Sequence, residues 1–269
     1  MSDQSDVPEG YNPRDFPPVA VTVDIVVFTI VNDALHVLLV ERGVPPFLGS
    51  WALPGGFVKP HESLDAAATR ELVEETGVSH EPGHLEQLAT YGAPDRDPRM
   101  RVVTVAYWGI LANLEPHGGG DAAYAGLVPV SKLDRGGIKL AFDHSAIVSD
   151  AIERARSKLE YTTLAAKFCP PEFTISQLRK VYETVWNERL DEGNFQRKVR
   201  SAPDFLLPLE ELSEPGLDGG RPAQLFELGH AQLLQSPIRR AEKFKFPELA
   251  ESPEPAATPS KPDEVEPDE

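Results

Sequence analysis

Three glutamates in one predicted helix constrain this chain more than any other feature. Glu71, Glu74 and Glu75 stand at positions i, i+3 and i+4 of a segment whose apolar residues recur at helical spacing. Residues three and four positions apart share a helix face, with Cβ atoms about 5–6 Å apart, and like charges there destabilise a helix unless they are neutralised. Arg70 supplies one positive charge. A hard divalent cation, Mg²⁺ or Mn²⁺, is the natural remaining partner.

The alternative is a solvated acidic face, which is the usual interpretation of a charge run. Two neighbouring features favour the cation site instead. Pro54-Gly55-Gly56 follows a predicted strand and can offer a backbone carbonyl near the helix, and Glu62 adds a fourth carboxylate just before the helix begins. Such a cluster has one evident use, which is to hold cations against the oxygens of a phosphate ester or anhydride.

The segment from Gly56 to Val78 resembles the signature of the Nudix hydrolases. That signature reads Gly, five residues, Glu, seven residues, then Arg-Glu-aliphatic-x-Glu-Glu-x-Gly-aliphatic. This chain fills every specified position, with Gly56, Glu62, Arg70-Glu71-Leu72, Glu74-Glu75 and Gly77-Val78. The resemblance covers roughly residues 19–140. It implies an α/β fold, the Nudix α/β/α sandwich, and hydrolysis of a nucleoside diphosphate linked to another moiety, with Mg²⁺ or Mn²⁺ as cofactor.

Carried over position by position, the resemblance assigns metal binding to the Gly56 carbonyl, Glu71 and Glu75. Glu74 would bind metal or deprotonate water, and Arg70 would orient a helix carboxylate, so Glu71, Glu74 and Arg70 are the candidate catalytic residues. Glu62 would be a supporting residue. Such metals neutralise diphosphate charge and lower the pKa of bound water. The family often takes its general base from a loop outside the signature, so the base stays open.

A second segment, Gly92 to Tyr107, looks like one found in ADP-ribose-type Nudix proteins and their regulatory relatives. Its candidate substrate-binding residues, for phosphate or ribose, are Arg96, Arg99 and Arg101. The alternative is that arginines and aspartates of this polar loop satisfy one another, because exposed ion pairs are common and individually weak. The sequence leaves both interpretations open.

Hydrophobic patterning predicts further elements on either side of these motifs. The expected strands are Val19–Ile30, Leu35–Arg42, His84–Pro94 and Met100–Leu111, and the expected helices are Ser63–Thr76, Ser145–Tyr161 and Thr162–Phe168. Isolated histidines, namely His61, His80, His84, His117 and His144, receive no role. Cys169 is expected to be a small buried apolar residue.

The C-terminal half predicts a winged helix-turn-helix. A helix from Thr174 to Trp186 is followed by a turn at residues 191–194, a short basic helix from Phe195 to Arg200, and two apolar runs that read as a ribbon. The candidate DNA contacts are Arg197, Lys198, Arg200 and, in the Gly/Pro-rich turn of the ribbon, Arg221. The alternative is a merely solvated basic helix.

Charge and cysteine content limit the possible partners. The chain has 26 Lys and Arg against 43 Asp and Glu, a net charge of −17, so it is not expected to coat nucleic acid or membranes without specificity. A local basic patch would be required. Cys169 is the only cysteine, which excludes an intramolecular disulfide and a multi-cysteine zinc site and fits a reducing, cytoplasmic setting. The N-terminal residues lack the pattern of a signal peptide, and no apolar run reaches the length of a membrane span.

From Val19 to Leu228 the chain looks like the Nudix-related transcriptional regulators of NAD metabolism, which sense ADP-ribose or a relative and bind operator DNA. The predicted organisation is a disordered lead-in (1–18), a Nudix domain (19–143), a winged helix (144–230) and a basic segment followed by a disordered acidic tail (231–269). A homodimer is expected from the resemblance, and because paired DNA half-sites usually require one.

The signature is intact, whereas many such regulators have a degraded one. Three interpretations therefore stand. The first is a hydrolase of ADP-ribose or a similar compound with an appended DNA-binding domain. The second is an ADP-ribose sensor with little or no turnover. The third is an enzyme whose winged helix mediates only protein contacts.

Overall fold

The computed structural model describes residues 11–78, 83–112, 114, 122–133, 137–214 and 222–240. Within these ranges, seven strands form one mixed sheet in which β3-β2-β1-β6-β5 are neighbours, β4 pairs with β1 and β7 pairs with β2. The strands are β1 (Ala20–Val31), β2 (Ala34–Arg42), β3 (Trp51–Ala52), β4 (Gly55–Phe57), β5 (His84–Tyr91), β6 (Val102–Ile110) and β7 (Ala122–Pro129).

Strand β1 lies at the centre of the sheet. It runs parallel to β6 from Ala20↔Val102 to Phe28↔Ile110, and it forms a hairpin with β2. Asn32 and Asp33 make the two-residue turn of that hairpin, both with positive φ, which these residue types tolerate. Both faces of β1 are covered by other parts of the chain, which explains its nearly continuous apolar sequence.

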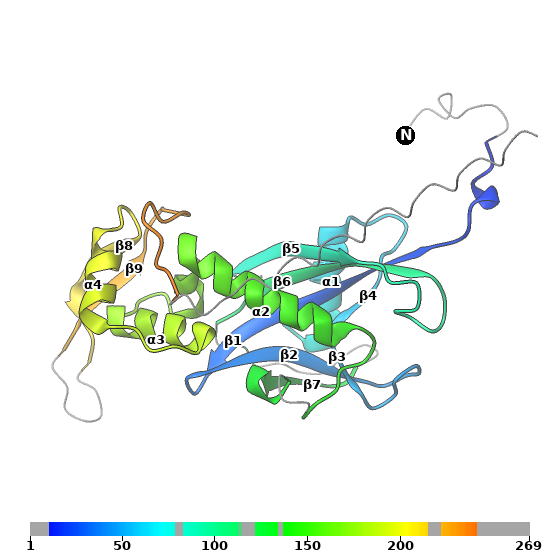
Figure 1. Ribbon diagram of the computed structural model, residues 1–269, viewed down its shortest axis with the longest axis horizontal. Helices are drawn as coiled ribbons and strands as arrows, with labels where there is room; N and C mark the ends of the chain where they lie inside the picture. Colours follow the sequence, from blue (N-terminus) through cyan, green and yellow to red (C-terminus); the bar gives the residue numbers. More distant parts are fainter. Residues whose placement is uncertain are drawn as a thin grey trace, which may run out of the picture. The chain divides into compact units, whose positions relative to one another are not determined.

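Helices α1 (Leu64–Thr76) and α2 (His144–Tyr161) lie on opposite sides of the sheet (Figure 1). Alternate residues of β1 point to the two faces. The face with Val23, Ile25 and Val27 packs in one core with α1 residues Ala67, Ala68 and Leu72. The opposite face, with Val26 and Phe28, packs with α2 residues Ile147, Ala151 and Leu159. The structure thus confirms the α/β/α sandwich.

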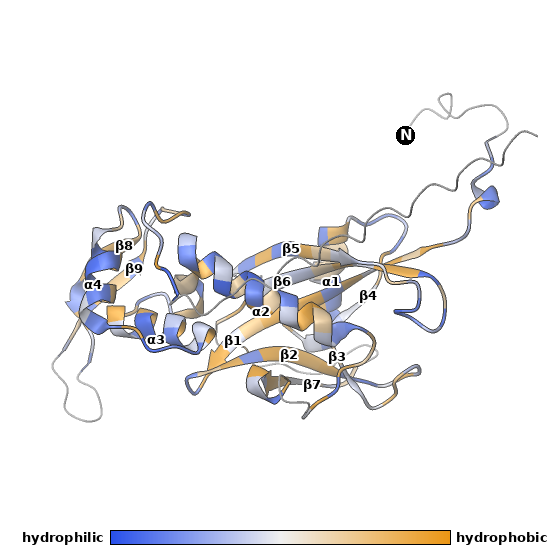
Figure 2. Cartoon of the chain, viewed as in Figure 1, coloured by the Kyte–Doolittle hydropathy of each residue, from blue (hydrophilic) through white to orange (hydrophobic). Residues whose placement is uncertain are grey.

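The C-terminal part contains α3 (Ile175–Trp186), α4 (Glu192–Ser201) and the antiparallel strands β8 (Leu206–Leu212) and β9 (Gln224–Leu228). This order of two helices and a ribbon confirms the winged helix. Its core contains Leu178, Tyr182, Phe195, Phe205 and Phe226. Figure 2 shows that hydrophobic residues are concentrated along β1 and β2, whereas α3 and α4 are largely hydrophilic.

Two helix starts in this part have clear physical causes. Thr174 caps α3 in a capping box, in which its hydroxyl accepts from the Gln177 backbone N–H and the Gln177 side chain accepts from Thr174 N–H. Asp191 caps α4 by accepting from Asn194 N–H. Residues 192–194, predicted as turn, are therefore the first turn of α4, so the basic helix begins three residues earlier than expected.

The sequence-based interpretation also missed three strands, β3, β4 and β7. Two of them are only two or three residues long, and β7 contains alanines and glycine, which are weak strand formers. The predicted helix at Thr162–Phe168 is a 3₁₀ helix at Leu164–Phe168. Cys169 is buried as expected, and its burial raises the pKa of the thiol to about 12. In the described ranges, no helix combines the length and apolar composition that crossing a membrane would need.

Candidate functional site

The predicted signature helix is α1, and its two ends are fixed by local chemistry. The Ser63 hydroxyl accepts from Ala66 N–H at 3.2 Å and starts the helix. Gly77 ends it in the left-handed conformation, at φ 65°, which glycine adopts without the steric cost of a Cβ. The apolar side of α1 faces the sheet. Its charged residues therefore lie on the other sides of the helix, where Arg70 contacts the segment that precedes the helix.

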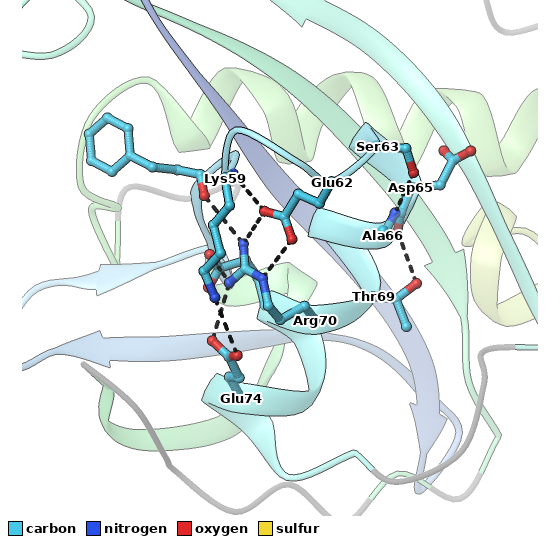
Figure 3. A network of polar contacts seen from close by, with 10 residues as sticks. Lys59, Glu62, Ser63, Asp65, Ala66, Thr69, Arg70 and Glu74 are labelled. Carbon is cyan, nitrogen blue, oxygen red and sulfur yellow. Dashed lines mark hydrogen bonds and ion pairs between the residues drawn. The ribbon is translucent and has the colours of Figure 1, made fainter. Parts of the chain in front are cut away.

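Arg70 is the centre of this charged cluster, and it contacts three of the four signature glutamates, of which Glu62 and Glu74 are labelled in Figure 3. Its Nε and Nη2 donate to the two carboxylate oxygens of Glu62 at 2.9 and 2.6 Å. Its Nη1 donates to Glu71 Oε1 at 2.6 Å and to Glu74 Oε2 at 3.2 Å. The guanidinium beside Glu62 lowers the pKa of that carboxyl from 4.5 to about 2. Arg70 therefore orients more carboxylates than the single one expected.

Glu71 and Glu75 both face the Gly55–Gly56 segment. Glu75 Oε2 accepts from Gly55 N–H at 2.9 Å. A Cβ on Gly56 would collide with the Glu71 carboxylate, so only glycine allows this approach. The segment is held in place because β4 pairs with β1 through Gly56↔Val23 and Gly55↔Asp24. The fold thus brings Gly56, Glu71 and Glu75 together, as the signature predicts, while Glu74 is half exposed and turned toward Arg70.

The donor chemistry here suits Mg²⁺ or Mn²⁺, because a backbone carbonyl and carboxylates are hard oxygen ligands. The side chain that Gly56 lacks leaves room for the Glu71 carboxylate next to its backbone. Within the part of the chain that the structure describes, no three acidic, histidine or cysteine side chains converge as a ready-made ion site. Arg70 explains this arrangement, since it draws Glu71 and Glu74 toward its own guanidinium.

A cavity opens beside this cluster, at the end of the sheet. Signature residues and residues of the polar loop share its wall. Its lining includes Thr22, Asp24, Arg42, Leu53, Gly55, Gly56, Phe57, Glu75, Arg96, Asp97, Arg99, Phe142 and His144. Of the three candidate arginines, Arg96 and Arg99 line the cavity, and Arg101 is not part of its lining.

The three arginines have different surroundings. Arg96, with a side chain 4% exposed, donates to both carboxylate oxygens of Asp143 at 2.9 and 2.7 Å and to Asp24 Oδ2 at 3.2 Å. Arg99 pairs with Asp97 at 2.7 Å, as the loop-internal interpretation expected. Arg101 donates to the backbone carbonyls of residues 92 and 93. Arg96 is thus anchored to β1 and to the start of α2 rather than to its own loop.

His144 lies in the cavity wall, although no motif in the sequence assigned it a role. It is buried, and its Nδ1 accepts from Leu53 N–H at 2.9 Å while Nε2 lies 3.4 Å from Asp24 Oδ1. Burial lowers the pKa of His144, which favours the neutral ring with its proton on Nε2. One signal was available: Asp24 is the only charged residue in the apolar run from Val19 to Ile30. A buried acid in a strand requires partners.

Helix α4 exposes the predicted basic residues while its apolar side, Phe195 and Val199, is buried. Arg197 donates to Asn194 Oδ1, and Lys198 Nζ lies 3.4 Å from the carbonyl of Pro237. The Arg200 guanidinium lies 5.3 Å from the Phe226 ring centroid, against the ribbon. Arg221 falls outside the described residues. The exposed side of α4 therefore carries the positive charge that contact with a nucleic acid backbone requires.

Comparison with known proteins agrees with both parts of the chain. The NUDIX domain matches residues 21–145, and the NrtR DNA-binding winged helix domain matches residues 165–228. The ADPR responsive transcriptional repressor NtrR of Acinetobacter baylyi is 33% identical over 250 residues, covering 90% of this chain and 92% of that protein. The ADP-ribose pyrophosphatase of Methanocaldococcus jannaschii is 38% identical over 121 residues, covering 45% of this chain and 68% of that enzyme.

A solved structure shows the same two-part architecture. Shewanella oneidensis NrtR complexed with a 27mer DNA superposes with a TM-score of 0.69 at 31% identity, covering 81% of this chain and 99% of that chain. The agreement extends over the sandwich, the winged helix and the order in which they occur. The chain belongs to the NrtR family, whose members join a NUDIX domain to a DNA-binding winged helix.

Proposed function

We propose that this protein binds ADP-ribose or a similar nucleoside diphosphate derivative in its NUDIX domain, hydrolyses the diphosphate with a divalent cation, and binds operator DNA through α4. The observation that carries the proposal is the shared wall of one cavity: Gly56 and Glu75 of the signature line it together with Arg96 and Arg99. Carboxylates that can hold cations thus adjoin guanidinium groups suited to phosphate.

NUDIX hydrolases generally use divalent metals, and in this chain the Gly56 carbonyl, Glu71, Glu74 and Glu75 would hold Mg²⁺ or Mn²⁺. When bound, such a cation neutralises diphosphate charge and activates water for attack on phosphorus. Arg70 positions the Glu71 and Glu74 carboxylates, and Glu62 fixes the Arg70 guanidinium. Arg99 faces the cavity and would contact the ligand. Arg96 would contribute positive charge from the cavity wall, whereas Arg101 would act from outside it.

For DNA binding, Arg197, Lys198 and Arg200 would contact backbone phosphates from α4, assisted by Arg221 in the ribbon turn. The named relatives, a repressor and an NrtR solved with DNA, support this role. We further propose a homodimer, because paired half-sites usually require one, acting in the cytoplasm. The proposed border between the NUDIX domain (19–143) and the winged helix (144–230) falls at the start of α2, which contacts both the sheet and α3.

A second candidate is an ADP-ribose sensor with little or no turnover. The contacts of Arg70 favour it, because one guanidinium already neutralises part of the charge on Glu62, Glu71 and Glu74 and competes with a cation for them. The relative that matches nearly the whole chain is named as an ADPR responsive repressor, which also favours sensing.

A substrate panel separates these candidates. Purified full-length protein is incubated with ADP-ribose and other nucleoside diphosphate derivatives in Mg²⁺ or Mn²⁺, release of AMP is measured, and binding is measured in parallel by calorimetry. Turnover supports the hydrolase, and binding without turnover supports the sensor. Absence of both contradicts the proposed function. If the protein shows no salt-sensitive binding to upstream genomic fragments, the remaining role for the winged helix is contact with proteins only.

A further inference from the structure

Helix α2 connects the cavity to the winged helix. Its first residue, His144, lies in the cavity wall, and its N-cap residue, Asp143, pairs with the buried Arg96. The helix has 18 residues and, at 1.5 Å per residue, extends about 27 Å from the cavity. Beyond its midpoint it contacts α3. A movement of the cavity wall can therefore reach the winged helix through one continuous element.

Two reciprocal hydrogen bonds join α2 to α3. Arg156 Nε donates to the carbonyl of Val185 at 3.0 Å, and Trp186 Nε1 donates to the carbonyl of Arg156 at 3.0 Å. Val185 and Trp186 are the last two residues of α3, and both are buried. The last carbonyls of a helix have no partner within the helix, so the Arg156 guanidinium satisfies one of them. We call these two bonds of Arg156 the α2–α3 joint.

A different side of α2 is fastened to strand β5. Asp150 Oδ2 accepts from the Tyr91 hydroxyl at 2.8 Å, and one turn later Arg154 Nη2 donates to the carbonyl of Leu88 at 3.2 Å. Helix α2 and β5 are therefore expected to move together. Side chains two positions apart do not share a helix face, so Arg154 bonds to the sheet whereas Arg156 bonds to α3.

Helix α3 is packed tightly against the basic helix α4. The rings of Tyr182 and Phe195 contact each other with centroids 5.2 Å apart, and both residues are buried. Because protein interiors are close-packed, a tilt of α3 is expected to move α4 as well. The β1–β2 turn also contacts α3, through an ion pair between Asp33 and Lys180 at 2.7 Å. Both of those side chains are more than half exposed, so this pair contributes little and the α2–α3 joint is the better shielded link.

We propose that Arg156 is a positioning residue, which transmits the state of the cavity to the DNA-binding helix α4 through its two bonds to the end of α3. The inference rests on the proposed function and names the place through which ligand regulates DNA binding. Coupling requires an element whose position both sites influence. Helix α2 is that element, because His144 at its start lines the cavity and Arg156 holds α3. Arg156 itself does not line the cavity and does not belong to α4.

The test compares Arg156→Ala with Trp186→Phe, which keeps an aromatic ring but removes the indole donor, and with the control Arg154→Ala. DNA affinity of each full-length protein for a genomic fragment that the wild type retains is measured by anisotropy, with and without saturating ADP-ribose and with Mg²⁺ omitted. We expect the wild-type ratio of the two affinities to be at least about fivefold. Substitutions along a coupling path change the coupling by about two- to thirtyfold, so Arg156→Ala should at least halve the ratio. Calorimetry should show the same ADP-ribose affinity in all four proteins.

Arg154→Ala should keep the wild-type ratio, and Trp186→Phe should lower it in the same direction as Arg156→Ala. An unchanged ratio in Arg156→Ala overturns the inference and leaves the proposed function intact. An equal drop in Arg154→Ala overturns it as well, because any weakening of α2 would then be sufficient. If Arg156→Ala does not fold or does not bind the fragment, the ratio of Trp186→Phe decides by the same criterion. A wild-type protein that binds no ADP-ribose, or whose ratio is one, contradicts the proposed function, and the inference fails with it.

Discussion

Arg70 holds both carboxylate oxygens of Glu62, with Nε 2.9 Å from Oε2 and Nη2 2.6 Å from Oε1. This two-point contact fixes the plane of the guanidinium, so that Nη1 faces Glu71, the next residue, and Glu74, one turn further along α1. Glu62, which precedes the helix, thus determines how Arg70 orients the carboxylates of Glu71 and Glu74.

The first prediction concerns the pH dependence of stability. The folded-state pKa of Glu62 is about 2, below its ordinary value of 4.5, so this carboxylate stabilises the fold above pH 4.5 and loses that effect as the pH falls toward 2. Glu62→Gln is expected to be less stable than the wild type at neutral pH, with the difference shrinking over this window. Urea unfolding midpoints across the window check it. A difference that stays constant with pH would contradict the role of the Glu62 charge.

The second prediction concerns turnover. Glu75→Gln keeps an oxygen that can accept from Gly55 N–H, so the fold is retained while the carboxylate charge is lost. The expected loss in Mg²⁺-dependent release of AMP is at least about 10- to 100-fold, the loss seen even when groups supporting a metal ligand are removed. Glu211→Gln, an exposed change on β8, is the matched control and should keep full turnover. Equal activity of the two variants would argue against a cation at Glu75.

The third prediction concerns stability and compares two arginines of the polar loop, the buried Arg96 and the exposed Arg101. Arg96→Ala leaves the buried Asp24 without its cation, and breaking a buried ion pair costs about 3–5 kcal/mol. Arg101→Ala removes exposed bonds to two carbonyls and should cost at most about 1.5 kcal/mol. Chemical denaturation measures both. If Arg96→Ala is as stable as Arg101→Ala, the Asp24–Arg96–Asp143 network does not support the cavity wall.

The fourth prediction concerns DNA. Arg197→Ala and Lys198→Ala remove charge from the exposed side of α4, so affinity should fall. The slope of log affinity against log salt should decrease by about 0.9 for each phosphate that the variant no longer neutralises. Lys139→Ala removes the same charge from an exposed position outside the winged helix. Fluorescence anisotropy with genomic fragments measures the DNA affinity of the three variants and of the wild type. Unchanged salt slopes in the α4 variants would remove these residues from the interface.

Local features of the sequence predicted local structure well. Helix α1 was predicted within one residue because its apolar spacing, the Ser63 cap and Gly77 all act within a few positions. The start of α4 was misplaced because Gly193 and Asn194 are typical of turns, whereas the Asp191 cap extends the helix over them. The glutamate cluster was found because its members share one helix.

Local sequence patterns could not predict the structural features that depend on residues far apart in the chain. The partners of Arg96 lie 72 and 47 positions away, so periodicity predicts neither. Strand β7 is stabilised by its pairing with β2, from His36↔Pro129 onward, and not by its own alanine-rich sequence. The place of His144 in the cavity wall depends on the packing of α2 against the sheet, which no local motif specifies.

The most direct test of the proposed function measures whether the two halves of the chain communicate. The affinity of the full-length protein for a genomic fragment that it retains is measured by anisotropy with and without saturating ADP-ribose, with Mg²⁺ omitted so that the ligand is not consumed. We predict a change in DNA affinity of at least about fivefold, within the usual range of coupling between two sites. Identical affinities, with ADP-ribose binding verified separately, would contradict a ligand-responsive DNA-binding protein.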